Sequence, residues 1–338
     1  MPDASRLSGV ATGVGSHPGT DPRAAAEIVV GEVALPYVPE LPARGLGADM
    51  IGHAAGLLAD VRVDVSTTGY RIGGAKGAVE RTISDLLRRD VDAFEEVYEL
   101  AGLRGRGRAI KIASAGPLTL AASLELVNGH RAARDRGARR DIAESLAEGL
   151  RTYAADLARW CGATVVVQLD EPMANIVLTG RIPALTRLDP IPPLPLPDAT
   201  DLLNTVLDGL GDHPTLLHLC GPIDWALVRG AHADGVGVDP SRLTERDYDG
   251  VGELVESGRV LGLGIVPPVP GVSKPVLEKV IEPAVRLFDA VGLPRAALAR
   301  TFVSPACGLA GAPEAYVRPA LALATRAADT IAAEPDAL

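Results

Sequence analysis

The feature of this sequence that most constrains its fold is a regular alternation of short apolar runs, rich in β-branched residues, with longer segments of helical periodicity. This alternation is typical of parallel strands that are joined by crossover helices. Eight candidate strands span residues 9–15, 33–38, 109–115, 164–170, 215–220, 235–239, 260–266 and 301–305. Eight strand–helix units predict an α/β fold of the (β/α)8 barrel type.

The chain of 338 residues is long enough for one such barrel, and we expect a single domain over residues 1–338. Residues 61–72 alternate valine with polar residues around a Thr-Thr-Gly segment, which predicts a β-hairpin inserted after the second strand. A doubly wound open sheet is the competing fold. The sequence favours the barrel because no Gly-x-Gly-x-x-Gly motif opens a helix after the first candidate strand.

The charge balance excludes two classes of partner. A formal net charge of −10 provides no basic field for nucleic acid or for an anionic membrane surface. Arginines cluster over residues 131–140, but Asp135 and Gly137 interrupt them and Asp141 follows, which is typical of a solvated helix start or loop. We therefore expect neither a nucleic-acid partner nor a membrane partner.

The cysteine content indicates a reducing compartment. Cys161, Cys220 and Cys307 are too few and too widely spaced for a disulfide framework, and their odd number leaves at least one thiol free. The N-terminal ten residues lack the apolar region of a targeting signal, and no window has the roughly 18 apolar residues of a membrane span. We expect a cytoplasmic protein.

Three candidate strands end in residues that can bind a metal ion. His218 and Cys220 are two positions apart at one strand end, a spacing that points both side chains to the same face. Cys307 follows the last strand, and Asp239 ends the sixth. In a (β/α)8 barrel these strand ends meet at the face where active sites form. Imidazole, thiolate and carboxylate together suit Zn²⁺, so the set predicts a zinc site.

The same residues also have a purely structural interpretation, which the sequence leaves open. Buried cysteines often act as small apolar residues, and His218 could be a hydrogen-bonded histidine of the core. Cys161 follows a helix and precedes the fourth candidate strand, at the opposite end of the barrel. We therefore expect Cys161 to be structural.

Two further strand ends carry candidate substrate-binding groups. Asp170 and Glu171 close the fourth strand directly before a proline, where adjacent carboxylates can bind an amine, a metal ion or a proton; Glu171 could instead pair with an arginine. Gly15, Ser16 and His17 close the first strand. Gly15 permits close backbone approach and Ser16 can donate a hydrogen bond, which fits a small carboxylate as well as an ordinary turn. We expect Asp170 and His17 to handle protons.

In their order along the chain, these segments resemble the catalytic barrel of the cobalamin-independent methionine synthase family. The resemblance covers nearly the whole chain, and six ordered segments are more specific than any one of them. The segments are Gly15-Ser16 and residues 115–119, 168–172, 218–220, 238–242 and 304–309.

The resemblance implies a zinc-dependent methyltransferase that methylates a small thiol, homocysteine, and so forms methionine. Homocysteine is then expected to lie against Gly15 and Ser16, with its amine at Asp170. Aspartate stands at residue 239 where the family usually has glutamate. The zinc ligands that the resemblance implies are His218, Cys220, Asp239 and Cys307.

This chain departs from the family in two segments. The family has a further acidic residue after its second strand, where residues 41–45 of this chain contain Arg44, near Asp49. The family also has an Asp-x-His-Ser segment that handles the folate methyl donor, and residues 262–268 contain no such proton donor. We therefore expect a donor other than folate polyglutamate, namely methylcobalamin, a corrinoid protein or another small methyl donor.

Two other functions are compatible with the sequence. A zinc- or thiol-binding homologue without methyltransferase activity would keep the ligands and lose the donor site. An enzyme similar to uroporphyrinogen decarboxylase would use the same barrel with arginines and an aspartate, and it would need neither thiols nor zinc.

Overall fold

The structure is a computed structural model that describes residues 4–73, 77–186, 188–271 and 275–338. The first three residues of the single domain predicted for residues 1–338 therefore lie outside the described residues. Six parallel strands form one curled sheet in the order β3-β4-β5-β6-β7-β8. They are β3 (Ala109–Ala115), β4 (Thr164–Asp170), β5 (Thr215–His218), β6 (Gly235–Val238), β7 (Val260–Val266) and β8 (Phe302–Pro305).

The apolar runs predicted these strands well. The bounds of β3, β4 and β7 agree with the predicted ranges, whereas β5 ends two residues early, β6 ends one residue early and β8 begins one residue late. Every residue of β3, β5, β6, β7 and β8 is buried. Strands that are covered on both faces require nearly continuous apolar sequence, which is why these runs were recognisable.

The first two predicted strands, residues 9–15 and 33–38, form isolated bridges and not continuous strands of the sheet, so the structure confirms six of the eight predicted strands. They make isolated parallel bridges, Ala11 with Val303 of β8 and Tyr37 with Lys111 of β3. The amide of Leu35 donates to the Ala11 carbonyl at 3.1 Å, which joins the two segments. Pro36 has no amide hydrogen to donate, so a continuous ladder cannot form there.

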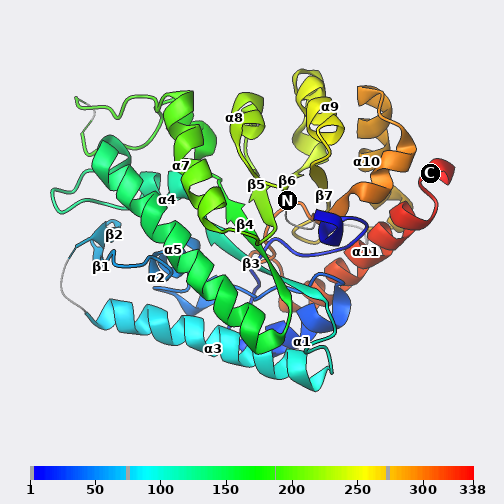
Figure 1. Cartoon of the computed structure of the whole chain (residues 1–338), viewed down its shortest axis with the longest axis horizontal. Helices are drawn as coiled ribbons and strands as arrows, with labels where there is room; N and C mark the ends of the chain where they lie inside the picture. The colour runs from blue at the N-terminus through cyan, green and yellow to red at the C-terminus, as the bar shows by residue number, and fades with distance from the viewer. Residues whose placement is uncertain (1–3, 74–76, 187, 272–274) are drawn as a thin grey trace.

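Helices lie on the outside of the sheet (Figure 1). Helices α1 and α3 lie side by side, as do α5 and α7, which cross in front of the sheet in this view. The helices are α1 (Pro22–Glu32), α2 (Met50–Gly56), α3 (Ala78–Leu100), α4 (Pro117–Ser123), α5 (Arg136–Cys161), α6 (Ala174–Leu178), α7 (Leu196–Gly209), α8 (Trp225–Gly230), α9 (Tyr248–Glu256), α10 (Leu277–Val291) and α11 (Glu314–Ala333).

Local sequence sets where several helices begin and end. The side chains of Asp21 and Asp135 accept hydrogen bonds from backbone amides in the first turns of α1 and α5. Such caps satisfy amides that have no partner within the helix. Gly162 ends α5 in the left-handed conformation with φ 59°, which glycine adopts without strain. No helix in the described ranges is both long and apolar enough to cross a membrane.

Strands β1 (Val63–Ser66) and β2 (Gly69–Ile72) form a separate antiparallel hairpin within the range predicted for one. The hairpin follows the extended segment at Tyr37 and helix α2, and not a second strand of the sheet. Its second strand is held by backbone bonds to Glu125, from the Ile72 amide at 2.7 Å and to the Tyr70 carbonyl at 2.9 Å.

Leu217 tests the placement of β5 in the core, because its side chain has 0% exposure. Leu217→Ala should lower the free energy of unfolding by about 2–5 kcal/mol, since it removes buried methyl groups and leaves a cavity. Urea denaturation measures the change. Leu188, which is 97% exposed, provides the control: Leu188→Ala should change stability by less than about 0.5 kcal/mol. Equal losses in the two variants would contradict this core.

Candidate active site

The carboxyl ends of β4, β5 and β8 bring together Asp170, His218, Cys220 and Cys307. Asp170 and His218 are partners in the register of β4 and β5. Cys220 and His218 lie close enough to the Cys307 thiol to lower its pKa, and the charge of Cys307 in turn raises the pKa of Asp170. Cys307 is distant in sequence but close in space. Strand β8 runs parallel to β4 and β5 in the same sheet, so the residues that follow these strands meet at one end of it. Three of the four predicted metal ligands therefore lie together.

The two thiols of this group share their protons unequally. Hydrogen bonds from Cys220 and His218 lower the pKa of Cys307, while the hydrogen bond to Cys307 raises the pKa of Cys220. Of the two thiols, Cys307 therefore loses its proton more readily, because the imidazole of His218 stabilises the thiolate. Cys161, by contrast, is buried, and burial raises the pKa of its thiol to about 12, as suits a structural cysteine.

His218 provides the clearest test of whether these residues suit a metal ion. Its side chain is buried, and its Nε2 has no hydrogen-bond partner among the described residues. A buried polar atom without a partner is costly, and a metal ion would satisfy it. One imidazole and two cysteine sulfurs are donors that Zn²⁺ prefers, so the chemistry of the set fits zinc. No three His, Cys, Asp or Glu side chains in the described ranges are already arranged to hold a metal ion.

Asp239, the fourth predicted ligand, caps a short helix. Its Oδ1 accepts hydrogen bonds from the Ser241 amide at 2.9 Å and the Ser241 hydroxyl at 2.6 Å, at the start of the 3-10 helix Pro240–Arg242. No hydrogen bond or ion pair in the described ranges joins Asp239 to His218 or to either thiol. Asp239 therefore lies at the same end of the sheet as the other three residues, but it does not contact them.

The turn that contains Gly15 and Ser16 lies against the loop of Cys307. The Leu309 amide donates to the Ser16 carbonyl at 2.8 Å. A Cβ atom on Gly308 would lie 2.0 Å from the Ser16 hydroxyl oxygen, so only glycine fits beside Cys307 here. The predicted carboxylate-binding turn and the thiol pair are therefore neighbours.

Glu40 is a functional candidate that the sequence analysis missed. It forms a parallel bridge with Ser16, and a Cβ atom on Gly15 would lie 3.6 Å from its Oε1. Its side chain is buried, and burial, followed by the negative charge of Asp170, raises its pKa to about 8. Its place directly after the second candidate strand was the available signal.

The expectation that Arg44 replaces the acidic residue after the second strand was wrong. Arg44 forms a bidentate ion pair with the buried carboxylate of Asp90, with N–O distances of 2.7 and 2.6 Å. This pairing neutralises the guanidinium, so Arg44 adds little positive charge to the site. Glu40 is the acidic group that follows this segment and approaches Gly15.

Lys111 of β3 is a second residue that the analysis missed, although a lone lysine in an apolar strand is a visible signal. It has 0% exposure, and its Nζ donates to the Val14 carbonyl and to Gln168 Oε1, both at 2.9 Å. Gln168 Nε2 in turn donates to Asp170 Oδ1 at 2.7 Å. Burial lowers the pKa of Lys111 to about 8, and the charges of Asp170 and Glu40 oppose this shift.

Glu171 and His17 have their polar atoms engaged elsewhere. The Glu171 carboxylate accepts bonds from the Leu118 amide at 2.8 Å, the Thr119 amide at 2.8 Å and the Thr119 hydroxyl at 2.6 Å. Glu171 therefore caps α4, and burial raises its pKa to about 7. His17 hydrogen-bonds to the Tyr37 hydroxyl, and burial lowers its pKa to about 4, so its ring is neutral at pH 7.

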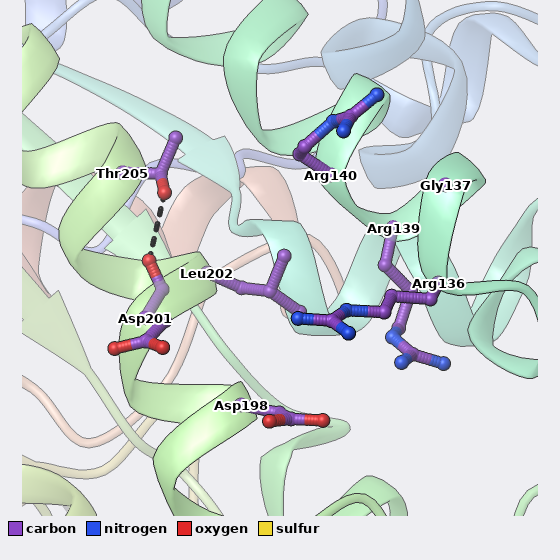
Figure 2. Close-up of a pocket in the computed structure, with 8 residues that line it drawn as sticks. All are labelled: Arg136, Gly137, Arg139, Arg140, Asp198, Asp201, Leu202 and Thr205. Atoms are coloured by element: carbon purple, nitrogen blue, oxygen red, sulfur yellow. Dashed lines mark hydrogen bonds between the residues drawn. The ribbon is translucent and has the colours of Figure 1, made fainter.

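The arginine-rich stretch, residues 131–140, was predicted to be a helix start or loop, and its residues 136–140 begin helix α5. These arginines line a cleft of about 420 Å³ between α5 and α7 (Figure 2). Asp198 and Asp201 of α7 line the same cleft and offset the arginine charge. The cleft contains none of the residues that gather at the ends of β4, β5 and β8.

The comparison with protein families identifies the chain. A family model described as the catalytic domain of cobalamin-independent synthase matches residues 10–330. The chain belongs to this family. The resemblance in the ordered segments is thereby confirmed, and the family is one of methyltransferases of the methionine synthase type.

Solved structures of this family's fold superpose over nearly the whole chain. A B12-independent methionine synthase from Shewanella sp. W3-18-1, solved with selenomethionine, is 12% identical with a TM-score of 0.60, covering 97% of this chain and 99% of that chain. A methyltransferase from Methanosarcina mazei is 14% identical with a TM-score of 0.57, covering 96% of each chain. No curated protein matches the chain. At this identity the structural likeness shows the fold.

Glu40 provides a pH-dependent test of this site. Its folded pKa of about 8 lies above the ordinary value of 4.5, so its stabilising contribution is present below pH 4.5 and is lost as the pH rises through 8. Glu40→Gln cannot ionise and should raise the free energy of unfolding at pH 9 by about 2–4 kcal/mol, with no gain at pH 4. Chemical denaturation at both pH values measures this. The exposed Glu256→Gln should show no such difference, and a pH-independent effect of Glu40→Gln would refute the burial argument.

Proposed function

We propose that this protein transfers a methyl group from a small donor to the thiol of homocysteine, forming methionine, with Zn²⁺ as its metal. The observation that carries the proposal is the gathering of His218, Cys220 and Cys307 at the strand ends beside the buried Asp170. Membership of the cobalamin-independent synthase family supports the same chemistry.

His218, Cys220 and Cys307 are the proposed zinc ligands. Asp239 is the proposed fourth ligand through Oδ2, because its described hydrogen bonds use Oδ1. Zinc, when bound, lowers the pKa of a coordinated thiol and so keeps the sulfur deprotonated near neutral pH. The unpartnered Nε2 of His218 supports its role as a ligand.

The chain's own groups provide a binding site for an amino acid. Asp170 and Glu40 are two buried carboxyl groups, and a substrate ammonium between them would favour their ionised forms. Gly15 and Ser16 are proposed to take the substrate carboxylate through backbone and hydroxyl donors. This arrangement supports an amino-acid thiol over a simple thiol.

The remaining predicted residues have supporting roles in this proposal. Glu171 holds the start of α4 next to Asp170 and so shapes the substrate side of the site. Asp170 contacts the substrate amine, and the neutral His17 exchanges a proton through the Tyr37 hydroxyl. In the reaction, the substrate sulfur attacks the methyl carbon, the new C–S bond forms, and the bond from methyl to donor breaks.

The donor and the fold complete the proposal. The loss of the folate-handling segment in residues 262–268 supports methylcobalamin or a corrinoid protein as donor. We also propose one domain with an eight-stranded barrel, because the bridges at Ala11 and Tyr37 support closure between β8 and β3.

A zinc- or thiol-binding homologue without transferase activity is the second candidate. The hydrogen bonds between Asp239 and Ser241 favour this candidate. If Asp239 stays bound to Ser241, three ligands hold the zinc, and the site lacks the negative charge of a fourth, carboxylate ligand. The uroporphyrinogen-decarboxylase-like function is less well supported, because it gives no role to the paired thiols.

The cysteines allow a direct test of the zinc ligands. Cys307→Ser should lose most of the bound zinc, since it removes one of two thiolate donors. Cys161→Ser should keep about one zinc per chain, because Cys161 is buried away from the pair. Metal content after purification and dialysis measures both variants, and equal zinc loss would undo this division of the cysteines.

The function itself is tested on the zinc-loaded wild-type protein. X-ray absorption should detect one additional sulfur ligand on zinc when homocysteine is added, because the substrate thiol joins the metal. Methionine formation is then measured with methylcobalamin, a methylated corrinoid protein and methyltetrahydrofolate triglutamate. If zinc gains a sulfur ligand but no donor yields methionine, the zinc- or thiol-binding homologue is favoured. If the protein binds no zinc, both the methyltransferase and the binding homologue are contradicted.

A further inference from the structure

A cavity of about 440 Å³ lies beside the carboxyl ends of β5 and β6. Leu219 and Gly221, the two neighbours of Cys220 in the chain, form one part of its wall. The other parts come from Trp225 at the start of α8 and from the 3-10 helices Pro240–Arg242 and Glu245–Asp247. A volume of this size is typical of sites for small molecules or for one part of a larger ligand.

The two carboxylates that line this cavity already accept hydrogen bonds from neighbouring residues. Asp247 accepts from the Trp225 indole at 2.9 Å with Oδ1, and from the Thr244 amide and hydroxyl at 2.8 and 2.9 Å with Oδ2. Asp239 accepts two bonds from Ser241. Both carboxylates of the cavity are therefore engaged with their own short helices.

The two arginines of the cavity, in contrast, are unpaired. Neither Arg242 nor Arg246 forms a side-chain hydrogen bond or an ion pair with any described residue. A guanidinium presents several donors in a planar fork that matches a carboxylate or a phosphate. The chain as a whole carries a net charge of −10. The two unpaired arginines therefore give this cavity a positive charge that most of the protein surface lacks.

We propose that this cavity binds the anionic group of the methyl donor, a carboxylate or a phosphate, between Arg242 and Arg246. The identity of the ligand as a methyl donor rests on the proposed function. Leu219 and Gly221 flank Cys220 in the chain, so a ligand bound here lies beside the strand end that carries this thiol. The half-buried Trp225 offers an apolar surface for the body of the donor.

The arginine-rich cleft between α5 and α7 does not fit this role. Asp198 and Asp201 face its arginines with carboxylates that offset their charge, and none of its residues adjoins Cys220 (Figure 2). The cavity at Arg242 and Arg246 combines unpaired positive charge with a wall formed by the two chain neighbours of Cys220, and this combination determines the choice.

Isothermal titration of the zinc-loaded protein tests the cavity without any need for turnover. The probes are methylcobalamin, which carries a phosphate, and methyltetrahydrofolate triglutamate, which carries carboxylates. Each single variant, Arg242→Ala or Arg246→Ala, should weaken donor binding about tenfold, and the double variant should weaken it more, because charge-assisted hydrogen bonds are lost. Binding to the wild type should also weaken as salt is raised.

Three controls make the result specific. Arg229→Ala removes an arginine that pairs with Glu253 at 2.6 Å outside the cavity, and it should leave donor binding unchanged. Arg242→Lys and Arg246→Lys keep the charge and should retain part of the affinity. Thermal unfolding and zinc content should match the wild type in all variants, which separates lost binding from lost folding.

Each outcome decides the proposal. Weakened binding of methylcobalamin alone identifies a phosphate donor, and weakened binding of the folate alone identifies a carboxylate donor; both support the cavity. Binding of both probes within twofold of wild type in the double variant overturns it, as does a wild type that binds neither probe. A wild type that binds a donor through these arginines but methylates no thiol overturns the proposed function and leaves the cavity standing.

Discussion

The buried ammonium group of Lys111 is the constraint on which the interior of this site depends. Removing such a charge from water costs several kcal/mol unless hydrogen bonds and opposite charges compensate. Here the Val14 carbonyl and Gln168 take its hydrogens, while the charges of Glu40 and Asp170 favour its protonated form. These contacts tie the first extended segment to β3 and β4, so the turn that follows Val14 and the end of β4 are held in one arrangement.

Adjacent residues at the end of β4 serve different purposes because successive side chains leave a strand on opposite sides. Asp170 is bound by Gln168 in the interior, whereas Glu171 caps α4 through Leu118 and Thr119. One carboxylate is therefore available to a substrate, and the other holds the neighbouring loop. The hydrogen bonds of Glu171 hold the loop after β4, and they thereby help to keep Asp170 in position.

The segment around Cys220 borders both the thiol pair and the arginine cavity. Cys307 approaches Cys220 from β8, while Gly221 forms part of the cavity wall next to Arg242. In the proposed function, the thiol substrate and the methyl donor meet at this strand end.

The sequence by itself determined the elements with a strong local signal: the apolar runs of β3, β4 and β7, the hairpin, and the strand-end residues His218, Cys220 and Asp170. Burial on both faces requires such runs, so their bounds could be predicted. Only the tertiary structure decided which charges meet. Arg44 pairs with Asp90, Glu40 approaches Gly15, and Asp239 binds Ser241. The periodicity of the sequence indicates whether a residue is buried. Which charged group it pairs with depends on which distant segments pack against it.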